Sequence, residues 1–264
     1  MSDKEIRQIT SADVDKITEF IRSSVLSSGN KGVVVGLSGG LDSATVTKLC
    51  ADALGPENVL NVFMPTTVTP TEDYKLTSDL SKQWGTRYKV FNVQPAVDAF
   101  TAMLFSNIKA PLERGNISAR CRMIVLYNQA KKLGYLVTGT SNKSELYMGY
   151  FTKFGDGASD IVPMIGLYKT QVRQLAKLVG VPQEIIDRAP TAGLWEGQTD
   201  EDEMGITYHD LDLLLNDIEY SLDDKEIAAH IGLPISKITE TREQVGKMKH
   251  KRVPALFPDL GWDH

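Results

Sequence analysis

A glycine-rich loop directly after an apolar, β-branched run is the feature of this chain that most restricts its fold. The run is Val33 to Val35, and the residues after it read Gly36-Leu37-Ser38-Gly39-Gly40-Leu41-Asp42-Ser43. Because the helix-like segment Ala44 to Leu54 follows, the pattern predicts a buried strand, a sharp turn and a helix. Glycine has no Cβ atom, so the backbone at Gly39 and Gly40 can turn with positive φ and lie against a ligand.

A turn of this kind is a site for an anion. Its successive N–H groups form a nest, and the helix that follows adds the positive end of its dipole, so phosphate is the expected ligand. Ser38 and Ser43 add hydroxyl donors. Asp42 would repel a phosphate unless a cation lay between the two, and Mg²⁺ fits because it binds carboxylates together with substrate phosphates.

Two other phosphate loops do not fit. A Walker loop needs Gly-Lys-Ser/Thr, and the only Gly-Lys pair, Gly246-Lys247, is followed by Met248. A dinucleotide fingerprint needs G-x-G-x-x-G, whereas the spacing here is G-x-x-G-G. The remaining pattern, Ser-Gly-Gly-x-Asp-Ser, resembles the pyrophosphate loop of the ATP pyrophosphatases, which cleave ATP between its α and β phosphates. A plain turn with a helix cap at Asp42 or Ser43 is the alternative.

The composition narrows the class of protein. The chain has 264 residues, with 29 Lys and Arg against 34 Asp and Glu, which gives a net charge of −5. This length suits one large α/β domain or a domain with an appended helical piece, and we expect one domain over residues 1–264. A mildly acidic chain without runs of Lys or Arg argues against a nucleic-acid partner. Cys50 and Cys121 are far apart in sequence, so neither a disulfide framework nor a structural zinc site is expected.

The sequence shows neither a membrane segment nor a secretion signal. Residues 1–10 are charged and lack an apolar centre. No apolar stretch approaches membrane-spanning length. We therefore expect a cytoplasmic protein without a membrane partner.

Strands and helices alternate through the first half of the chain. Apolar runs predict further strands at Val59 to Met64 and Arg87 to Val93, with a helix at Asp73 to Trp84 between them. This β-α-β-α-β order predicts a Rossmann-like, open, mainly parallel α/β sheet with helices on both faces. Ligands bind outside the carboxyl ends of such strands, so the loops after Leu37, Met64 and Val93 are expected to share one edge. Met64 is there either an adenine neighbour or a packing residue.

The next predicted helix, Ile117 to Leu133, is apolar on nearly all sides. A helix of that kind is buried between layers or between subunits. Arg120 and Arg122 lie near its predicted start, where cations oppose the helix dipole. An anionic partner therefore explains them better than a solvated helix end.

A second loop at the same edge follows the predicted strand Tyr135 to Thr138. It offers the Thr140 hydroxyl and the Glu145 carboxylate. Glu145 is either a surface residue in the first turn of a helix or, paired across the edge with Asp42, a second ligand for Mg²⁺.

The remaining sequence combines irregular loops with helices. Residues 149–160 show no helix or strand period, and long irregular loops of this kind are more often functional than accidental. Lys153, Asp160 and Lys169 occur along this stretch and at the start of the helix Lys169 to Val179. The acidic, glycine-interrupted segment Glu196 to Glu203 predicts a mobile lid rather than a packed element. Three closing helices are predicted, at Tyr208 to Asn216, Asp223 to Ile231 and Ile235 to Met248.

Taken together, these motifs resemble the ammonia-dependent NAD synthetases over nearly the full length of the chain. The stretches that carry the resemblance are Ser38 to Ser43, Gly115-Asn116, Ala119-Arg120, Arg122-Met123, Gly139-Thr140 with Glu145, Tyr150 to Asp156, Pro190-Thr191-Ala192, Asp200-Glu201 and His250-Lys251-Arg252. The resemblance implies an adenine nucleotide α-hydrolase-like fold with a helical C-terminal extension. It also implies a homodimer that adenylates deamido-NAD⁺ with ATP and then amidates it with ammonia.

The resemblance also implies roles for particular residues. ATP would be contacted by the loop Gly36 to Ser43 and by Thr140, Lys169 and Thr191, with Asp42, Lys169 and Thr191 taking part in catalysis. Asp42 and Glu145 would hold Mg²⁺. Deamido-NAD⁺ would be contacted by Arg120, Lys153, Asp160, His250 and Lys251.

The sequence departs from the family pattern at one place. Ser141-Asn142-Lys143-Ser144 replaces the Asp-His-Ala-Ala of many bacterial members, although the spacing from Thr140 to Glu145 is kept. Neither Cys50 nor Cys121 occurs in a nucleophile-elbow context, so free ammonia is the expected nitrogen source, while a separate glutaminase subunit stays open. Rival interpretations are a tRNA-modifying thiolase or lysidine synthetase, which would show a basic surface or paired cysteines, and a non-catalytic ATP-binding sensor, which would not need Glu145, Lys153, Asp160 or Lys169.

Overall fold

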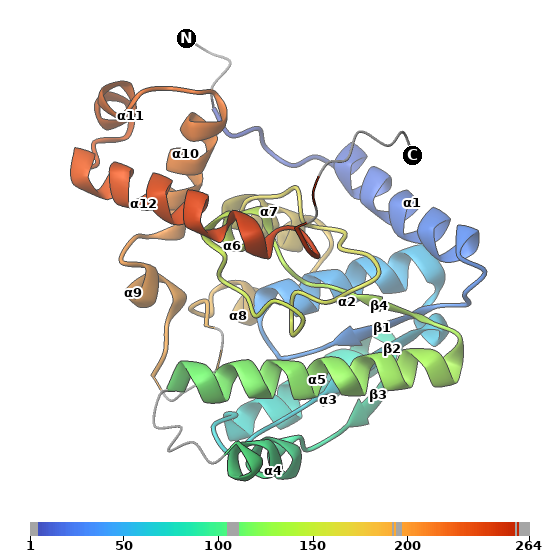
Figure 1. Ribbon diagram of the computed structural model, residues 1–264. Helices are drawn as coiled ribbons and strands as arrows, with labels where there is room; N and C mark the ends of the chain where they lie inside the picture. Colours follow the sequence, from blue (N-terminus) through green and yellow to red (C-terminus); the bar gives the residue numbers. More distant parts are fainter. Residues whose placement is uncertain (1–4, 105–110, 192, 194–196, 257, 259–264) are drawn as a thin grey trace.

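A parallel four-stranded sheet lies at the centre of the computed structural model, which describes residues 5–104, 111–191, 193, 197–256 and 258 (Figure 1). The strands are β1 (Val33–Gly36), β2 (Val59–Phe63), β3 (Arg87–Val90) and β4 (Leu136–Thr138). Their spatial order is β3-β2-β1-β4, and every pairing is parallel. Val34 of β1 lies beside Leu60 of β2 and Val137 of β4, so β1 occupies a central position.

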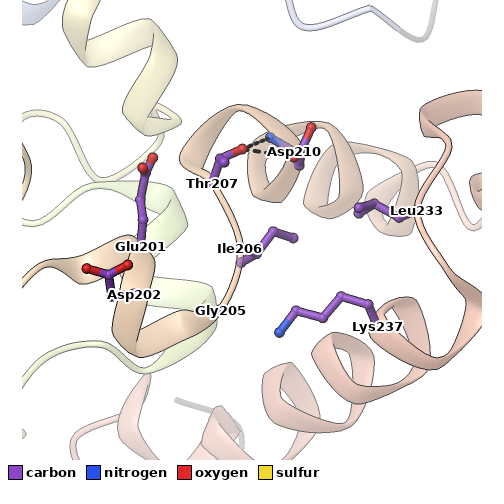
Figure 2. A pocket seen from close by; sticks show the side chains of 8 residues that line it. All are labelled: Glu201, Asp202, Gly205, Ile206, Thr207, Asp210, Leu233 and Lys237. Atoms are coloured by element: carbon purple, nitrogen blue, oxygen red, sulfur yellow. Dashed lines mark hydrogen bonds between the residues drawn. The ribbon is translucent and has the colours of Figure 1, made fainter.

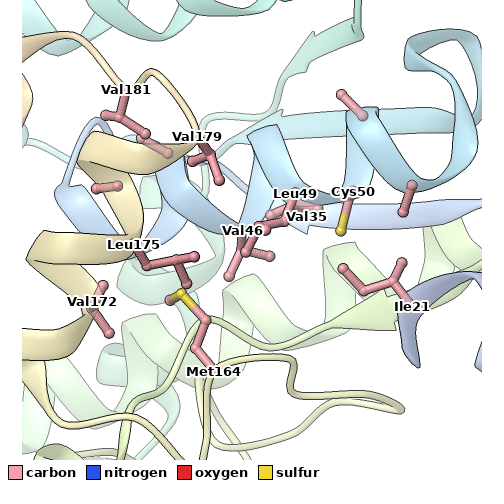
Figure 3. Close-up of a cluster of buried hydrophobic side chains, with 14 of the residues drawn as sticks. Ile21, Val35, Val46, Leu49, Cys50, Met164, Val172, Leu175, Val179 and Val181 are labelled. Carbon is pink, nitrogen blue, oxygen red and sulfur yellow. The ribbon is translucent and has the colours of Figure 1, made fainter. Parts of the chain in front are cut away.

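Alternate residues of β1 face opposite sides of the sheet, as the period of a strand requires. Val33 and Val35 join one apolar core together with side chains of α1 (Ser11–Ser27), α2 (Leu41–Leu54), α7 (Lys169–Leu178) and α8 (Gln183–Ile186), part of which Figure 3 shows. α3 (Thr71–Trp84) packs on this side through Leu80. Val34 joins the other core, with α4 (Gln94–Met103) and α5 (Pro111–Leu133). The prediction of a parallel sheet with helices on both faces is therefore confirmed.

One buried polar side chain ties three elements of the sheet core together. Asn61 of β2 is fully buried, and its Oδ1 accepts a hydrogen bond from Thr47 Oγ1 of α2 at 3.1 Å. Its Nδ2 donates to Ser81 Oγ of α3 at 3.0 Å and to Thr86 Oγ1 at 2.8 Å. Because all three partners are satisfied, the buried amide positions α2 and α3 relative to the sheet instead of destabilising it.

The C-terminal third is helical and has a core of its own. It comprises α9 (Asp200–Met204), α10 (Tyr208–Glu219), α11 (Asp224–Ile231), α12 (Ile235–Lys247) and the 3-10 turn η2 (Met248–Lys251). Leu211, Leu214 and Ile238 are fully buried in this core, which confirms the predicted helical extension. α6 (Lys143–Met148) packs between this extension and the sheet. A second 3-10 turn, η1 (Pro56–Asn58), precedes β2.

The start of α5 differs from the prediction. The helix begins at Pro111 rather than at Ile117, and α4, which was not predicted, precedes it. Arg120 and Arg122 therefore lie well inside the helix, and the argument from an opposed helix dipole was wrong. Arg122 is half-buried and its Nε donates to the Met64 carbonyl at 3.0 Å, so its role in the fold is to join α5 to the end of β2.

The acidic segment before α10 is partly packed. Gln198 and Asp200 are buried, and Asp200 opens the short helix α9, whose N-cap Thr199 accepts a hydrogen bond from Asp202 N–H. The expectation of an unpacked segment is therefore wrong for Gln198 and Asp200, whereas Asp202 and Glu203 are exposed, and movement of the segment as a lid stays a prediction. Its first residue, Glu196, lies outside the described residues, as does Ala192 of the Pro190-Thr191-Ala192 motif.

Among the described residues, the helices are too short or too polar for any of them to be a membrane-spanning candidate.

Candidate active site

The glycine-rich loop connects β1 to α2 at the carboxyl edge of the sheet. Gly39 has φ +89, in the region that favours glycine, and Gly40 caps α2. The loop is closed by its own hydroxyl groups: Ser43 Oγ accepts from Ser38 N–H at 3.2 Å, and Ser38 Oγ accepts from Gly40 N–H at 3.2 Å. The first N–H groups of α2 have no acceptor within the helix, so they point out of the loop as the expected anion site.

A buried lysine lies beside this anion site between two carboxylates. Lys169, the first residue of α7, has a side chain only 3% exposed, and its Nζ donates to Asp42 Oδ2 and, at 3.2 Å, to Glu145 Oε1. Its ammonium group also lies 5.2 Å from the centre of the Tyr208 ring. Three residues predicted from separate stretches of the sequence thus meet at one point.

The electrostatics of this cluster favour an additional cation. The pKa of Glu145 is raised to about 7, mainly by burial; the charge of Lys169 opposes this rise, and the charges of Asp42 and Asp200 add to it. Burial lowers the pKa of Lys169, but the negative charges of Asp42 and Glu145 outweigh this effect, so the pKa is raised and the ammonium stays protonated. A cation bound beside these carboxylates would favour the ionised form of Glu145.

Asn142 contacts both candidate metal ligands, Asp42 and Glu145, and so fixes their relative positions. Its side chain is fully buried, its Oδ1 accepts from Glu145 N–H at 3.0 Å as the cap of α6, and its Nδ2 lies 3.4 Å from Asp42 Oδ1. The residue belongs to the Ser141 to Ser144 stretch in which the sequence departs from the family pattern. That departure therefore preserves the placement of Asp42 and Glu145.

Asp212 of α10 holds the start of α7 and so the position of Lys169. Its Oδ1 accepts from Ser144 Oγ at 2.5 Å and its Oδ2 from Thr170 N–H at 2.8 Å, while Ser144 Oγ accepts from Lys169 N–H at 2.9 Å. The carboxylate is fully buried against the positive end of the helix dipole, where negative charge is stabilised.

The donor set fits a metal ion that binds together with the nucleotide. In the part of the chain that the structure describes, no group of three or more His, Cys, Asp and Glu side chains forms a metal site on its own. Asp42 and Glu145 supply two carboxylates, 18% and 16% exposed, at the edge of the phosphate loop. Two carboxylates completed by phosphate oxygens and water is the usual coordination of Mg²⁺ in nucleotide sites.

A second group of predicted residues gathers where α5, the loop after α6 and η2 meet. Arg120 Nη2 donates to the Lys153 carbonyl at 3.2 Å, Lys153 Nζ donates to the His250 carbonyl at 2.7 Å, and Lys251 Nζ donates to the Gly149 carbonyl. Burial lowers the pKa of Lys251, and the positive charge of Arg120 adds to this effect. Four of the five residues predicted to bind deamido-NAD⁺ therefore form one positively charged cluster.

The remaining predicted residues are less closely connected. Asp160 Oδ2 accepts from Val137 N–H at 2.7 Å and its Oδ1 lies 3.5 Å from Tyr127 Oη, so the carboxylate is bound to β4 and to α5. Thr191 is exposed, and its Oγ1 accepts from Gly193 N–H at 3.1 Å. Thr140 is half-buried just after β4. Met64 lies over the end of β1, where its Cε is 3.4 Å from the position of a Cβ added at Gly36, which supports the packing interpretation.

Sequence reasoning missed several residues of the site. Asp200 is buried, and its Oδ2 accepts from Tyr208 Oη at 3.0 Å next to the lysine. Asp200-Glu201 already belonged to the family resemblance, and that was the available signal. No comparable sequence signal pointed to Asn142 or Asp212, because their roles depend on contacts between distant segments.

A surface pocket lies between α9, α10 and α12, and two of its lining residues, Glu201 and Thr207, are the chain neighbours of Asp200 and Tyr208 (Figure 2). It has a volume of about 480 Å³, and its lining residues are Glu201, Asp202, Gly205, Ile206, Thr207, Asp210, Leu233 and Lys237. Lys237 Nζ donates to the Met204 carbonyl at 3.0 Å, and Glu201 Oε1 accepts from Tyr208 N–H at 2.8 Å. These polar groups serve the packing of the helical extension, and none belongs to the predicted site.

The comparisons with known proteins agree with this geometry. The model of the family described as NAD synthase matches residues 13–255. An NH(3)-dependent NAD(+) synthetase from Pyrococcus horikoshii is 48% identical over 253 residues, which cover 94% of this chain and 96% of the relative. A second, from Thermococcus kodakarensis, is 46% identical over 94% of this chain and 97% of the relative.

Two solved structures are similar over nearly their whole length. The NMN synthetase from Francisella tularensis has a TM-score of 0.83 at 34% identity, with 95% of this chain and 98% of the other covered. The NH3-dependent NAD synthetase from Campylobacter jejuni has a TM-score of 0.78 at 31% identity, with 94% and 98% covered. The match of the family model, the identity to these relatives and the shared fold show that this chain belongs to the NAD synthase family.

Proposed function

We propose that this protein catalyses the ATP-dependent amidation of deamido-NAD⁺ with ammonia, forming NAD⁺, AMP and pyrophosphate. The observation that carries the proposal is the meeting of Lys169, Asp42 and Glu145 beside the glycine-rich phosphate loop. A non-catalytic ATP sensor would not need this arrangement. The identity to ammonia-dependent synthetases supports the choice of reaction.

The first step activates a poor acyl donor. A carboxylate oxygen of the nicotinate attacks the α-phosphorus of ATP, a new P–O bond forms, and the bond to the β-phosphate breaks to release pyrophosphate. The loop N–H groups, the Ser38 and Ser43 hydroxyls and the Lys169 ammonium stabilise the charge that accumulates on the phosphate oxygens. Mg²⁺ held by Asp42 and Glu145 would neutralise part of the same charge when bound.

The second step forms the amide. Ammonia attacks the carbonyl carbon of the acyl-adenylate, the C–O bond to AMP breaks, and a proton leaves the nitrogen. The protein forms no covalent bond to the substrate in this scheme, so binding and electrostatic stabilisation supply the catalysis. This agrees with the absence of a reactive cysteine among the described residues, since Cys50 and Cys121 are both buried.

The cationic cluster of Arg120, Lys153 and Lys251 suits the diphosphate of deamido-NAD⁺. Arginine and lysine bind phosphate oxygens through charge-assisted hydrogen bonds, and the cluster lies partly on loops, which carry binding residues more often than rigid elements do. The His250 backbone, held by Lys153, closes the cluster from the C-terminal side. Asp160, which caps β4, retains a proposed role in orienting the same substrate through its second oxygen.

We also propose that residues 1–264 act as one catalytic unit in a cytoplasmic homodimer. Support for one unit comes from α10, which supplies Asp212 and Tyr208 to the site although it belongs to the helical extension. Support for a dimer comes from exposed apolar side chains on α4 and α5 and just after α4, namely Phe100, Met103, Leu104, Leu112 and Ile124. Apolar surface of this kind marks an interaction site more often than an ordinary surface.

The decisive experiment is an assay of the purified protein with deamido-NAD⁺, ATP, Mg²⁺ and an ammonium salt, with AMP and NAD⁺ measured together. We expect equal amounts of both products and no ADP. Glutamine in place of ammonium tests for a second nitrogen donor, and we expect little turnover with it. The acid counterpart of NMN tests the activity named for the Francisella relative. Formation of ADP, or AMP without NAD⁺, contradicts the proposal.

A further inference from the structure

Arg188 lies against the glycine-rich loop, although nothing in the proposed mechanism uses it. Its Nη1 donates to the Gly39 carbonyl at 3.1 Å and to Asp73 Oδ1 at 2.8 Å. The residue follows α8, whose Ile185 and Ile186 are buried in the sheet core and whose Ile186 carbonyl accepts from Arg173 Nη1 at 2.5 Å. A packed element therefore delivers this guanidinium to the phosphate loop.

Asp73, the partner of Arg188, also lies close to the glycine-rich loop. It belongs to the first turn of α3, and its side chain is only 10% exposed. A Cβ placed on Gly39 would lie 3.2 Å from Asp73 Oδ1 and 3.4 Å from Arg188 Nη1, so the ion pair is in contact with the residue at which the loop turns. A carboxylate at this distance from a phosphate site repels the nucleotide unless a cation compensates it.

The Arg188 side chain is more exposed than that of Asp73, so a ligand can reach the arginine more easily than the carboxylate. The Arg188 side chain is 34% exposed, and its two hydrogen bonds within the described residues both use Nη1. Arginine presents five donors in a planar fork that matches phosphate oxygens. Arg188 also lies three residues before Thr191, which is itself a predicted ATP contact. The same segment would therefore supply two residues to the nucleotide site.

We propose that Arg188 binds the phosphate groups that leave as pyrophosphate, and that Asp73 competes with those phosphates for the guanidinium. The inference rests on the proposed function, because it concerns the leaving group of that reaction. In the free protein, Asp73 holds Arg188 at the loop, and the two side chains neutralise each other's charge there. When the nucleotide binds, the guanidinium turns toward the β and γ phosphates, whose charge grows as the α–β bond breaks.

A purely compensating ion pair makes a different prediction for the double substitution. Arg188→Gln exposes the repulsive charge of Asp73 and Asp73→Asn removes it, so the two single substitutions act in opposite directions whether or not the guanidinium touches the phosphates. If Arg188 serves only to neutralise Asp73, Arg188→Gln combined with Asp73→Asn restores pyrophosphate binding, which overturns the inference. If the guanidinium itself binds the phosphates, the double variant stays weak.

The test measures binding of Mg²⁺-pyrophosphate and of Mg²⁺-ATP by calorimetry, together with steady-state KM values. Arg188→Gln is expected to weaken pyrophosphate binding and to raise the KM for ATP by about tenfold or more, the effect typical of a lost charge-assisted hydrogen bond. The KM for deamido-NAD⁺ is expected to stay unchanged. Asp73→Asn is expected to bind pyrophosphate at least as tightly as the unaltered protein. Arg188→Lys, which keeps the charge without the fork, is expected to fall between.

The controls separate binding from folding. Arg22→Gln removes a surface arginine that pairs with Glu19 within α1, and it is expected to change neither binding nor KM. Thermal unfolding of each variant identifies any loss of folded protein, and Arg188→Lys supplies the measurement if Arg188→Gln does not fold. Unchanged pyrophosphate binding by Arg188→Gln, or equal weakening by Arg188→Gln and Asp73→Asn, overturns the inference.

Failure of the proposed function gives a different result. If the unaltered protein forms no AMP from ATP and deamido-NAD⁺ and binds no pyrophosphate, the reaction itself is wrong. If the unaltered protein forms AMP and binds pyrophosphate, and the Arg188 variants bind pyrophosphate equally well, the proposed reaction stands and only the proposed role of Arg188 is wrong.

Discussion

At the scale of single residues, Asp42 has the largest expected effect on activity. It lies in the first turn of α2, directly after the glycine-rich loop, accepts a hydrogen bond from Lys169 and lies near Asn142. Because the neutral amide is a far weaker Mg²⁺ ligand and a poorer partner for an ammonium ion, we expect Asp42→Asn to abolish AMP formation by weakening binding of Mg²⁺-ATP.

The measurement is the rate of AMP release at saturating deamido-NAD⁺, with ATP binding followed by calorimetry. Asp52→Asn on the same helix is the matched control, since Asp52 is exposed and pairs with Lys48 on the same face of the helix. We expect it to retain the activity of the unaltered protein. Near-normal turnover by Asp42→Asn would contradict the role of the residue.

The two cysteines lead to a prediction about pH. Cys50 is fully buried, and burial raises the pKa of its thiol to about 12. Only the thiolate reacts with alkylating agents, so Cys50 is expected to stay unmodified in the folded protein at pH 9, where an exposed thiol of pKa about 8.5 is largely ionised. The unfolded chain loses this proton first, so the residue's contribution to stability decreases as the pH rises from about 8.5 toward 12.

Mass spectrometry after iodoacetamide treatment at pH 7 and pH 9 checks this prediction. The same treatment in guanidinium chloride is the control, and it is expected to modify both Cys50 and Cys121. Rapid modification of Cys50 in the folded protein at pH 9 would show that the residue is accessible.

At the scale of elements, the contact between α10 and the start of α7 decides where Lys169 lies. Asp212 accepts hydrogen bonds from Ser144 Oγ and Thr170 N–H without contacting the proposed substrates. Asp212→Ala leaves both donors buried without a partner, so we expect the free energy of unfolding to fall by about 1–3 kcal/mol. We also expect kcat to fall more than the KM for ATP changes, because the proposed role of Lys169 is to stabilise the charge that develops during the reaction.

Chemical denaturation and steady-state kinetics of Asp212→Ala and Asp212→Asn measure these effects. The asparagine variant keeps one acceptor and is expected to be less impaired in both stability and kcat. Equal loss in the two variants would mean that the charge of Asp212, and not its acceptor geometry, supports the helix.

At the scale of the whole molecule, the exposed apolar side chains of α4 and α5 predict association. Ile124 is 53% exposed on α5, whereas Cys121 and Ala130 of the same helix are buried in the core beside the sheet. We expect a dimer in sedimentation at micromolar concentration, and we expect Ile124→Lys to shift it toward the monomer because a charge at the centre of an interface is desolvated on association.

Ile235→Lys supplies the control, since Ile235 is 48% exposed at the start of α12, away from this surface. It is expected to leave the association unchanged. A monomeric unaltered protein would rule out the proposed dimer.

The local parts of the fold were predictable because neighbouring residues determine them. Val33 to Val35 are apolar and β-branched, Gly39 permits the turn, and Ala44 to Leu54 continue as a helix, so the strand, loop and helix could be placed before the structure was known. The start of α5 could not, because Pro111 to Asn116 are mostly polar and their helical state depends on packing rather than on an apolar period.

The sequence by itself therefore determined the strand, loop and helix around Gly39 and the parallel sheet. Through the family resemblance it also predicted Asp42, Glu145 and Lys169, three side chains that meet in the structure. The tertiary structure decided how these groups are held: Asn142 between the two carboxylates, Asp212 under α7, and Arg188 between Gly39 and Asp73. Asp42 and Lys169 are 127 residues apart, and Arg188 and Gly39 are 149 apart. Contacts over such separations form only when packed elements bring the segments together, so local periodicity carries no trace of them.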